Sequence, residues 1–105
     1  MLDKIKKAVK LKNIKYRDHA LERMMQRSIL RSEVQKAILE GKIIEKYNDD
    51  FPFPSVLIAY IKTSKPLHIV LSYDDINNIC YIITAYIPNI SHFEDDLITR
   101  KKDEY

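Results

Sequence analysis

The spacing of the apolar positions changes near the middle of the chain. Before Gly41 they recur every three or four residues, which is typical of helices that bury one face. After Gly41 they fall in short runs rich in isoleucine, valine and tyrosine, separated by proline, asparagine and aspartate. The pattern therefore predicts a helical first part followed by a sheet.

The first predicted helix covers residues 2–11. Its apolar stripe consists of Leu2, Ile5, Ala8 and Val9, and lysines cover the remaining positions. A basic helix of this kind packs on a core with its lysines in water, binds phosphates, or rests on an anionic membrane. We favour packing on a core, with phosphate binding second. The stripe is narrow and contains no aromatic residue, which counts against a membrane.

The segment HALERMMQR, residues 19–27, predicts a second helix with Asp18 as its N-cap. The stripe that we expect this helix to bury consists of Leu21, Met24, Met25 and Ser28. His19, Arg23 and Arg27 follow one another in steps of four residues, so they form a ladder on another side of the same helix.

A third helix is predicted before Gly41. Ser32 and Gln35 have the spacing of a capping box, so we expect the helix to begin at Ser32. Its buried stripe consists of Val34, Ala37 and Ile38. Gly41, the only glycine of the chain, is expected to end the helix in the left-handed conformation.

Four strands are predicted after Gly41, at residues 42–47, 55–61, 67–73 and 79–86. The connections are too short for crossover helices, so the strands are expected to form an antiparallel meander. The predicted class is α+β, with N-terminal helices packed on a four-stranded sheet. Pro88 ends the last strand, and the remainder is expected to be either a short docking helix or a frayed tail.

The turn at residues 74–78 predicts the pairing of the last two strands. If it pairs Tyr73 with Ile79, His68 lies opposite Thr84 and Tyr86 lies diagonal to His68. A polar group then forms on one face of the sheet. The other face, toward the helices, is expected to carry Leu67, Ile69, Leu71, Tyr81, Ile83 and Ala85.

Composition and charge indicate the size of the domain and a class of binding partner. The 105 residues are enough for one domain with one core, and an apolar share of 46% is typical of globular proteins. The net charge is only +3, but basic residues crowd the first seventeen positions. An acidic polymer such as RNA is a reasonable partner for these side chains, of which we select Lys4, Lys7, Lys10, Lys15 and Arg17.

The single cysteine, Cys80, cannot form a disulfide within the chain and fits a reducing compartment. The sequence contains no apolar run long enough to span a membrane, and its start lacks the apolar block of a signal peptide. These observations predict a cytoplasmic protein.

The ladder of His19, Arg23 and Arg27 is the first candidate for chemistry. Histidine moves a proton near neutral pH, and guanidinium groups bind phosphate oxygens in pairs, so this set suits a phosphodiester. The alternative is an ordinary solvated helix face, on which Asp18 and Glu22 balance the arginines.

Metal chemistry finds less support in the sequence. The possible nitrogen and sulfur ligands His19, His68, His92 and Cys80 show no tight ligand spacing. Paired carboxylates occur at residues 49–50, 74–75 and 94–96, where turn chemistry explains them. We therefore expect neither a metal nor another cofactor, and the remaining candidates are histidine, arginine and tyrosine side chains.

Three runs resemble a known family: HALERMMQRSILRSEVQKAILEGKIIEKY, PSVLIAYIKTSKPLHIVLSYDD and YIITAYIP. The family consists of small prokaryotic proteins catalogued as a domain of unknown function, group four-two-five-eight. It is similar in layout to RNase toxins such as RelE, BrnT and MqsR, whose superfold includes barnase. The resemblance implies a RelE-like fold and a partner antitoxin, such as a YgiT-like zinc-finger protein. The site residues that it implies are His19, Arg23, Arg27 and His68, with Glu45, Thr84 and Tyr86 as additions.

The function implied by this resemblance is a metal-independent endoribonuclease toxin. A base takes the proton of the ribose 2′-hydroxyl, the oxygen attacks the adjacent phosphate, and an acid protonates the leaving 5′-oxygen. We do not assign base and acid between His19 and His68, which are expected to converge in one open cleft. The alternatives are an inactive RNA- or protein-binding module of the same fold and a bare interaction domain.

Overall fold

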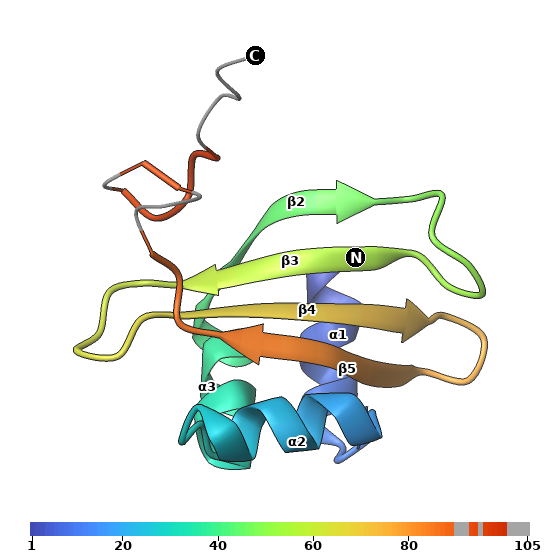
Figure 1. Ribbon diagram of the computed structural model, residues 1–105. Coiled ribbons are helices and arrows are strands. Elements are labelled where there is room, and N and C mark those ends of the chain that lie inside the picture. Colours follow the sequence, from blue (N-terminus) through green and yellow to red (C-terminus); the bar gives the residue numbers. More distant parts are fainter. Residues whose placement is uncertain (90–92, 95, 101–105) are drawn as a thin grey trace.

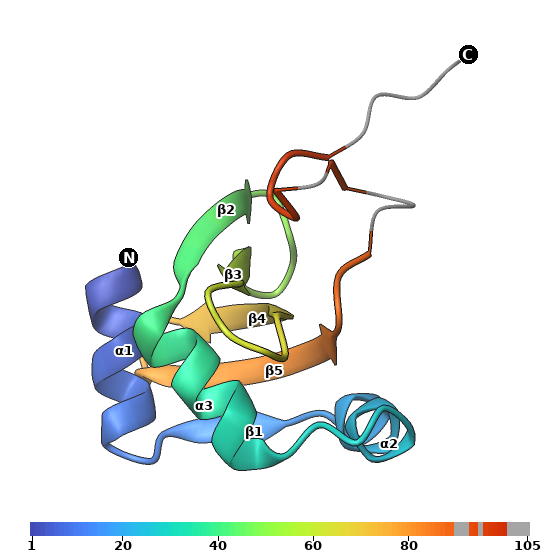
Figure 2. The same cartoon turned by 90° about the vertical axis from the view of Figure 1, so that its left-hand side faces the viewer.

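The computed structural model describes residues 1–89, 93–94 and 96–100, and the structure below is that of these residues. The elements follow the order α1 (Leu2–Lys10), β1 (Ile14–Tyr16), α2 (Asp18–Gln26), α3 (Arg31–Glu40), β2 (Lys42–Tyr47), β3 (Ser55–Tyr60), β4 (Leu67–Asp74) and β5 (Ile79–Tyr86). The strands form one sheet in the order β1-β5-β4-β3-β2 (Figure 1). α1 and α3 cover one face of this sheet, and α2 runs along β5 (Figures 1 and 2).

The predicted α+β class and the antiparallel meander of β2 to β5 are confirmed, but the sheet has a fifth strand. β1 pairs parallel with β5, so the sheet is mixed. The Arg17 N–H donates to the Ile82 carbonyl, and the Cys80 N–H donates to the Asn13 carbonyl. A strand of three residues is too short to show a period in the sequence, and only its pairing with β5 defines it.

The core lies between the sheet and its helices. The stripe predicted for α3 is confirmed, and that for α1 is confirmed except that Leu2 is only partly buried. The fully buried positions are Ile5, Ala8, Val9, Val34, Ala37 and Ile38. They pack against Val56, Ile58, Ile69, Leu71, Cys80 and Ile82 of the strands. Within the described residues, no helix combines the length and the apolar character that crossing a membrane requires.

The buried face of α2 differs from the prediction. Of the predicted stripe, Met24 is buried and Leu21 is partly buried, whereas Met25 is 83% exposed and Ser28 is also exposed. Ala20, which was not predicted, is buried in their place. The N-cap is Arg17, and Asp18 is the first residue of the helix. β1 leads directly into α2, so the pairing of β1 with β5 fixes the direction and rotation of the helix and turns Met25 toward solvent.

Both ends of α3 also differ from the prediction. The helix begins at Arg31, because the Glu33 carboxylate accepts a hydrogen bond of 2.8 Å from the Leu30 N–H. The expected pair of Ser32 and Gln35 is therefore not the cap. Gly41 ends the helix as predicted, but with φ −84° it is not left-handed.

The reason for glycine at position 41 is the space around it. A Cβ at this position would lie 2.4 Å from the Ala37 carbonyl oxygen and 2.6 Å from the Ala59 carbonyl oxygen. Both neighbours are backbone atoms, which cannot move away without shifting α3 or β3. Gly41 thus allows the end of α3 to approach the sheet closely.

The predicted register of β4 and β5 is wrong by one residue near the turn and by two residues beyond a bulge. Asp74 pairs with Ile79, because its carboxylate accepts the N–H groups of Ile76 and Asn77 and closes a shorter turn. A bulge beside Val70 then inserts an extra residue into β5.

As a result of this register, His68 lies opposite Tyr86 instead of Thr84. The bulge restores the alternation, so His68, Thr84 and Tyr86 do share one face, as predicted. Tyr81 and Ile83 do not belong to the core: Tyr81 shares the face of Ser72, and Ile83 is 37% exposed. The core positions of β5 are Cys80, Ile82 and Ala85.

Candidate functional site

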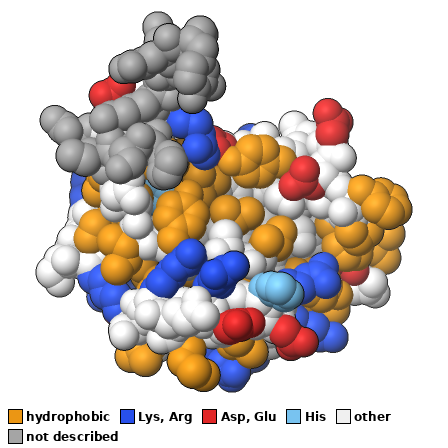
Figure 3. Space-filling model, in the orientation of Figure 1, with side chains coloured by type: hydrophobic (Ala, Val, Ile, Leu, Met, Phe, Trp, Pro, Cys, Tyr) orange, Lys and Arg blue, Asp and Glu red, His pale blue; other side chains and the backbone are white. Residues whose placement is uncertain are grey.

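The sheet face opposite α1 and α3 carries the predicted polar residues, and we call it the open face. Neighbouring strands place His68 beside Tyr86, and Glu45 in line with Leu57, Val70 and Thr84. Figure 3 views this face. Basic side chains and a histidine follow the line of α2, below a patch of hydrophobic side chains. The open face thus brings together residues from both halves of the sequence.

His68 is fully buried on the open face, and its two ring nitrogens are both engaged. Nε2 lies 2.6 Å from the Leu97 carbonyl oxygen, and Nδ1 lies 3.2 Å from the Tyr86 hydroxyl oxygen. A carbonyl only accepts, so Nε2 carries the ring proton and Nδ1 accepts from the Tyr86 hydroxyl. The tautomer of His68 is therefore fixed by the chain itself.

The protonation states of this pair follow from burial. Burial lowers the pKa of His68 below its usual value, although Leu97 and Glu45 oppose the shift, so the imidazole is neutral at neutral pH. Burial also raises the pKa of Tyr86, so its hydroxyl keeps its proton. The result is a neutral pair in which Tyr86 donates and His68 accepts.

Glu45 lies near this pair but is bound elsewhere. The Arg100 guanidinium donates two hydrogen bonds of 2.9 Å to the Glu45 carboxylate, and the Tyr47 hydroxyl donates a third. Arg100 is the main reason that the pKa of Glu45 is lowered. Burial and Glu45 raise the pKa of Tyr47 to about 12. Glu45 is thus an ionised, saturated carboxylate, and its charge acts on His68 through space.

The described residues 93–94 and 96–100, which we call the covering segment, lie at the His68 end of the open face, on the side of the sheet away from α1 (Figure 2). Phe93 is 2% exposed, packs edge-on against the His68 ring at 4.6 Å between centroids, and forms a bridge with Arg100. The residues of the covering segment form turns, so the predicted docking helix is absent from them. The buried Phe93 also rules out a frayed tail at this point.

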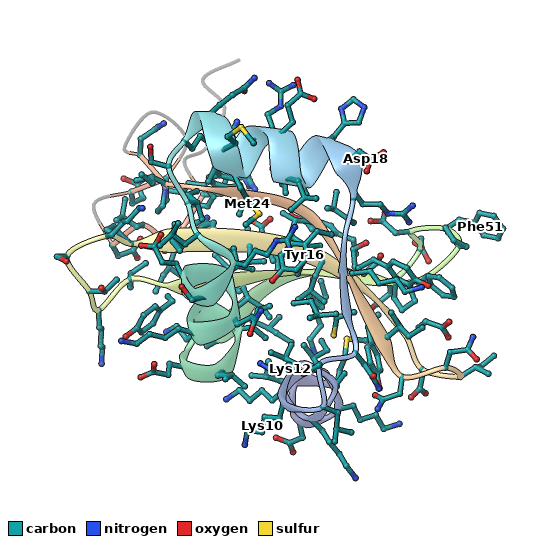
Figure 4. The ribbon with its side chains drawn as sticks, turned by 90° about the horizontal axis from the view of Figure 1, so that it is seen from below. Lys10, Lys12, Tyr16, Asp18, Met24 and Phe51 are labelled. Carbon is teal, nitrogen blue, oxygen red and sulfur yellow. The ribbon has the colours of Figure 1, made fainter. Side chains whose placement is uncertain are left out.

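The predicted ladder on α2 is exposed along its whole length. α2 runs beside β5. Before its start the Arg17 N–H donates to the Ile82 carbonyl, and after its end Arg27 Nη1 donates to the Ala85 carbonyl at 2.9 Å. The Arg27 guanidinium is therefore held at the residue before Tyr86. His19 is eight residues away, roughly 12 Å along the helix axis, and directly follows Asp18, which begins α2 (Figure 4). His19 and His68 are brought to one side of the molecule but not to one point.

The basic residues predicted to bind RNA are divided between two sides. Lys4, Lys7 and Lys10 belong to α1, behind the sheet, and Lys4 pairs with Asp75 at 3.1 Å. Lys15 is exposed on the edge strand β1. Only Arg17 reaches the open face, where its guanidinium lies 5.2 Å from the centre of the Tyr81 ring.

Three residues of this site were missed in the sequence: Tyr47, Phe93 and Arg100. The alternation along β2 gives a signal for Tyr47, which lies two residues after Glu45 and so points to the same face. No signal existed for Phe93 and Arg100, because their contacts join segments that are far apart in the chain.

No metal site appears among the described residues, where no three histidine, cysteine or acidic side chains lie close enough to hold an ion. His92 lies outside them. The carboxylates of Asp74 and Asp96 accept backbone N–H groups of their own turns, in agreement with the turn chemistry predicted for them.

The lowered pKa of His68 predicts a dependence of stability on pH. Between about pH 6.5 and the lower pKa of folded His68, the unfolded chain binds a proton that the folded chain does not. We therefore expect the free energy of unfolding to fall as the pH decreases from about 7 toward the lower pKa of folded His68. Urea denaturation at several pH values measures this. His68→Gln should flatten the curve in this window, and an unchanged slope would show that another group causes it.

Comparison with known proteins gives one match. Residues 16–87 match the family model described as a domain of unknown function, DUF4258. The comparisons with curated proteins and with solved structures gave no match. The matched region runs from Tyr16, the last residue of β1, to the residue after β5, and it contains α2, His68 and Tyr86 but not Phe93 or Arg100.

Proposed function

Since the chain belongs to the DUF4258 family, and its open face pairs a tyrosine with a buried histidine beside exposed arginines, we propose that it is a metal-independent endoribonuclease. The observation that carries the proposal is the hydrogen bond from Tyr86 to His68, with Arg27 held at the adjacent Ala85 carbonyl. In this proposal the Tyr86–His68 pair accepts the proton, and Arg27, held at the residue before Tyr86, binds the phosphate.

Tyr86 and His68 act as one base in this proposal. The ribose 2′-hydroxyl gives its proton to the Tyr86 oxygen while the Tyr86 proton passes to His68 Nδ1. The 2′-oxygen attacks the phosphorus, and the 5′-oxygen leaves with a proton taken from water. The charge of Glu45 favours the imidazolium that forms. His68 takes part through Tyr86, so it need not be exposed.

The arginines of α2 stabilise the charge that develops on the phosphate. Arg27, bonded to the carbonyl of the residue before Tyr86, contacts the reacting phosphate in this proposal, and Arg23 is exposed one turn earlier. His19 lies too far along the helix to act on the same phosphate, so in this proposal it binds a neighbouring nucleotide. The helix thus aligns an RNA strand with β5.

The test is incubation of the purified protein with single-stranded RNA in excess chelator. We expect new RNA ends with 2′,3′-cyclic phosphates, because the attacking group is the 2′-hydroxyl, and no cleavage of DNA of the same sequence. Arg27→Gln should slow cleavage by about tenfold or more. Cleavage that requires an added divalent ion, or products lacking the cyclic phosphate, would contradict the proposal.

A second candidate function is RNA binding without cleavage. It is favoured by the state of His68, which is fully buried and has both nitrogens engaged by Tyr86 and Leu97. The same assay separates the two candidates. RNA that remains intact but migrates more slowly on a native gel in the presence of the protein identifies a binding module.

We extend the proposal to a toxin held inactive by a protein antitoxin, in a cytoplasmic setting that suits its RNA substrate and the buried free thiol of Cys80. What supports this step is the family resemblance, together with three helices that precede the four long antiparallel strands. The RelE-like identity of this fold is itself part of the proposal. Induced expression should then arrest cell growth, and co-expression of the neighbouring gene should relieve the arrest. Unimpaired growth at high expression would count against a toxin.

A further inference from the structure

The far end of the open face carries a group of aromatic side chains that the proposed cleavage does not use. The rings of Phe53 and Tyr81 stack at 5.7 Å between centroids and 3° between planes. The Arg17 guanidinium lies 5.2 Å from the centre of the Tyr81 ring. Phe51, two residues before Phe53, is 94% exposed. We call these four residues the aromatic platform.

We propose that the aromatic platform binds an unpaired nucleobase of a single-stranded RNA, at a distance from the bond that is cut. This inference rests on the proposed function, because it takes the RNA bound by α2 as its ligand. Unpaired bases stack on exposed aromatic rings and on guanidinium planes, and such stacking tolerates any base. Phe51 offers an exposed ring of this kind, two residues along the chain from a stack that is already formed.

The platform has a defined place on the molecule. In the sheet order, Arg17 approaches Tyr81 from the side of β1, and Phe53 approaches from the side of β3. Tyr81 lies five residues before Tyr86 on β5, which is roughly 17 Å along the strand. Figure 4 shows Phe51 projecting from the body of the protein at the end where Asp18 begins α2. The platform and the Tyr86 site therefore occupy opposite ends of one path along β5.

The charges along this path indicate how an RNA strand lies on it. Arg17, Arg23 and Arg27 line the α2 side and are exposed, so they suit the phosphates. Asp49 and Asp50, on the loop of Phe51, are also exposed and repel phosphates from that side. The backbone then follows α2, and the base turns toward Phe51.

An isolated exposed apolar residue provides the matched control. Ile76, in the turn between β4 and β5, is 93% exposed and belongs to no aromatic group. Removing either side chain leaves the buried core intact, so neither Phe51→Ala nor Ile76→Ala should change the fold. Circular dichroism and the thermal midpoint check this for both variants.

The experiment uses a 2′-O-methyl RNA of about ten nucleotides that carries one 2-aminopurine, in chelator. The probe cannot be cleaved by 2′-hydroxyl attack, so it measures binding alone. We expect its fluorescence to be quenched on binding, because 2-aminopurine loses emission when it stacks. Phe51→Ala should weaken binding by about five- to a hundredfold, the range of measured base–aromatic stacking, and remove the quenching. Ile76→Ala should behave as the wild type.

The outcomes separate this inference from the proposed function. Equal binding by Phe51→Ala and the wild type, equal binding of a duplex probe, or no binding at all would overturn the platform, whether or not ordinary RNA is cleaved. Binding that depends on Phe51, with no cleavage of ordinary RNA, would support the platform and overturn the nuclease.

Discussion

Replacing Tyr86 by phenylalanine is expected to slow RNA cleavage by about a hundredfold or more, in the range that general acid–base groups supply. The substitution removes only the oxygen through which the 2′-hydroxyl proton reaches His68. The ring remains and keeps its edge contact with His68, at 5.3 Å between centroids. Affinity for an uncleavable 2′-O-methyl RNA should stay the same, because Arg23 and Arg27 are untouched. Single-turnover cleavage rates and fluorescence anisotropy measure the two effects.

Thr84→Val provides a matched control for this substitution. Thr84 lies on the same strand and face, and its replacement by valine also removes one hydroxyl, but this hydroxyl makes no hydrogen bond among the described residues. Thr84→Val should therefore leave the rate within about twofold. His68→Gln should reduce the rate as strongly as Tyr86→Phe. Full activity of Tyr86→Phe, together with loss of activity in His19→Ala, would move the catalytic centre to the start of α2.

The largest effect on stability is expected for Gly41→Ala. The added methyl group would lie 2.4 Å from the Ala37 carbonyl oxygen and 2.9 Å from the Ile58 side chain. Overpacking of a core costs about 1–3 kcal/mol, and here the nearest atoms belong to the backbone, so we expect about 3 kcal/mol. The melting temperature should fall by about 10 °C or more. Urea denaturation and a thermal melt measure the change.

Lys42→Ala tests whether this loss is specific to position 41. Lys42 is the next residue, and its side chain is exposed at the start of β2, so its removal should change the free energy of unfolding by less than about 0.5 kcal/mol. A loss below about 1 kcal/mol for Gly41→Ala would mean that α3 moves away from β3 at little cost. In that case the close approach at Gly41 would not be needed to fix the helix on the sheet.

The helices and the four long strands could be predicted from the sequence, because each depends on a pattern repeated over six residues or more. The ends of β2 and β5 were predicted at the observed residues, and those of β3 and β4 within one residue. The buried stripes of α1 and α3 follow from helical spacing alone. His68, Thr84 and Tyr86 were placed on one face because alternation along a strand survives a shift of register by two.

The tertiary structure decided what depends on contacts between distant segments. β1 exists because β5 pairs with it, and that pairing fixes which side of α2 is buried. The turn at Asp74 and the bulge at Val70 set His68 opposite Tyr86.

The sequence likewise did not predict that Phe93 covers His68, or that aromatic side chains gather at the other end of the open face. Arg100 binds Glu45, which is 55 positions away in the chain, and Phe53 stacks on Tyr81, which belongs to a different strand. The sequence determined which residues each element contributes, since local periodicity controls burial. Only the fold determined which of them meet, since pairing, bulges and docking are properties of two segments at once.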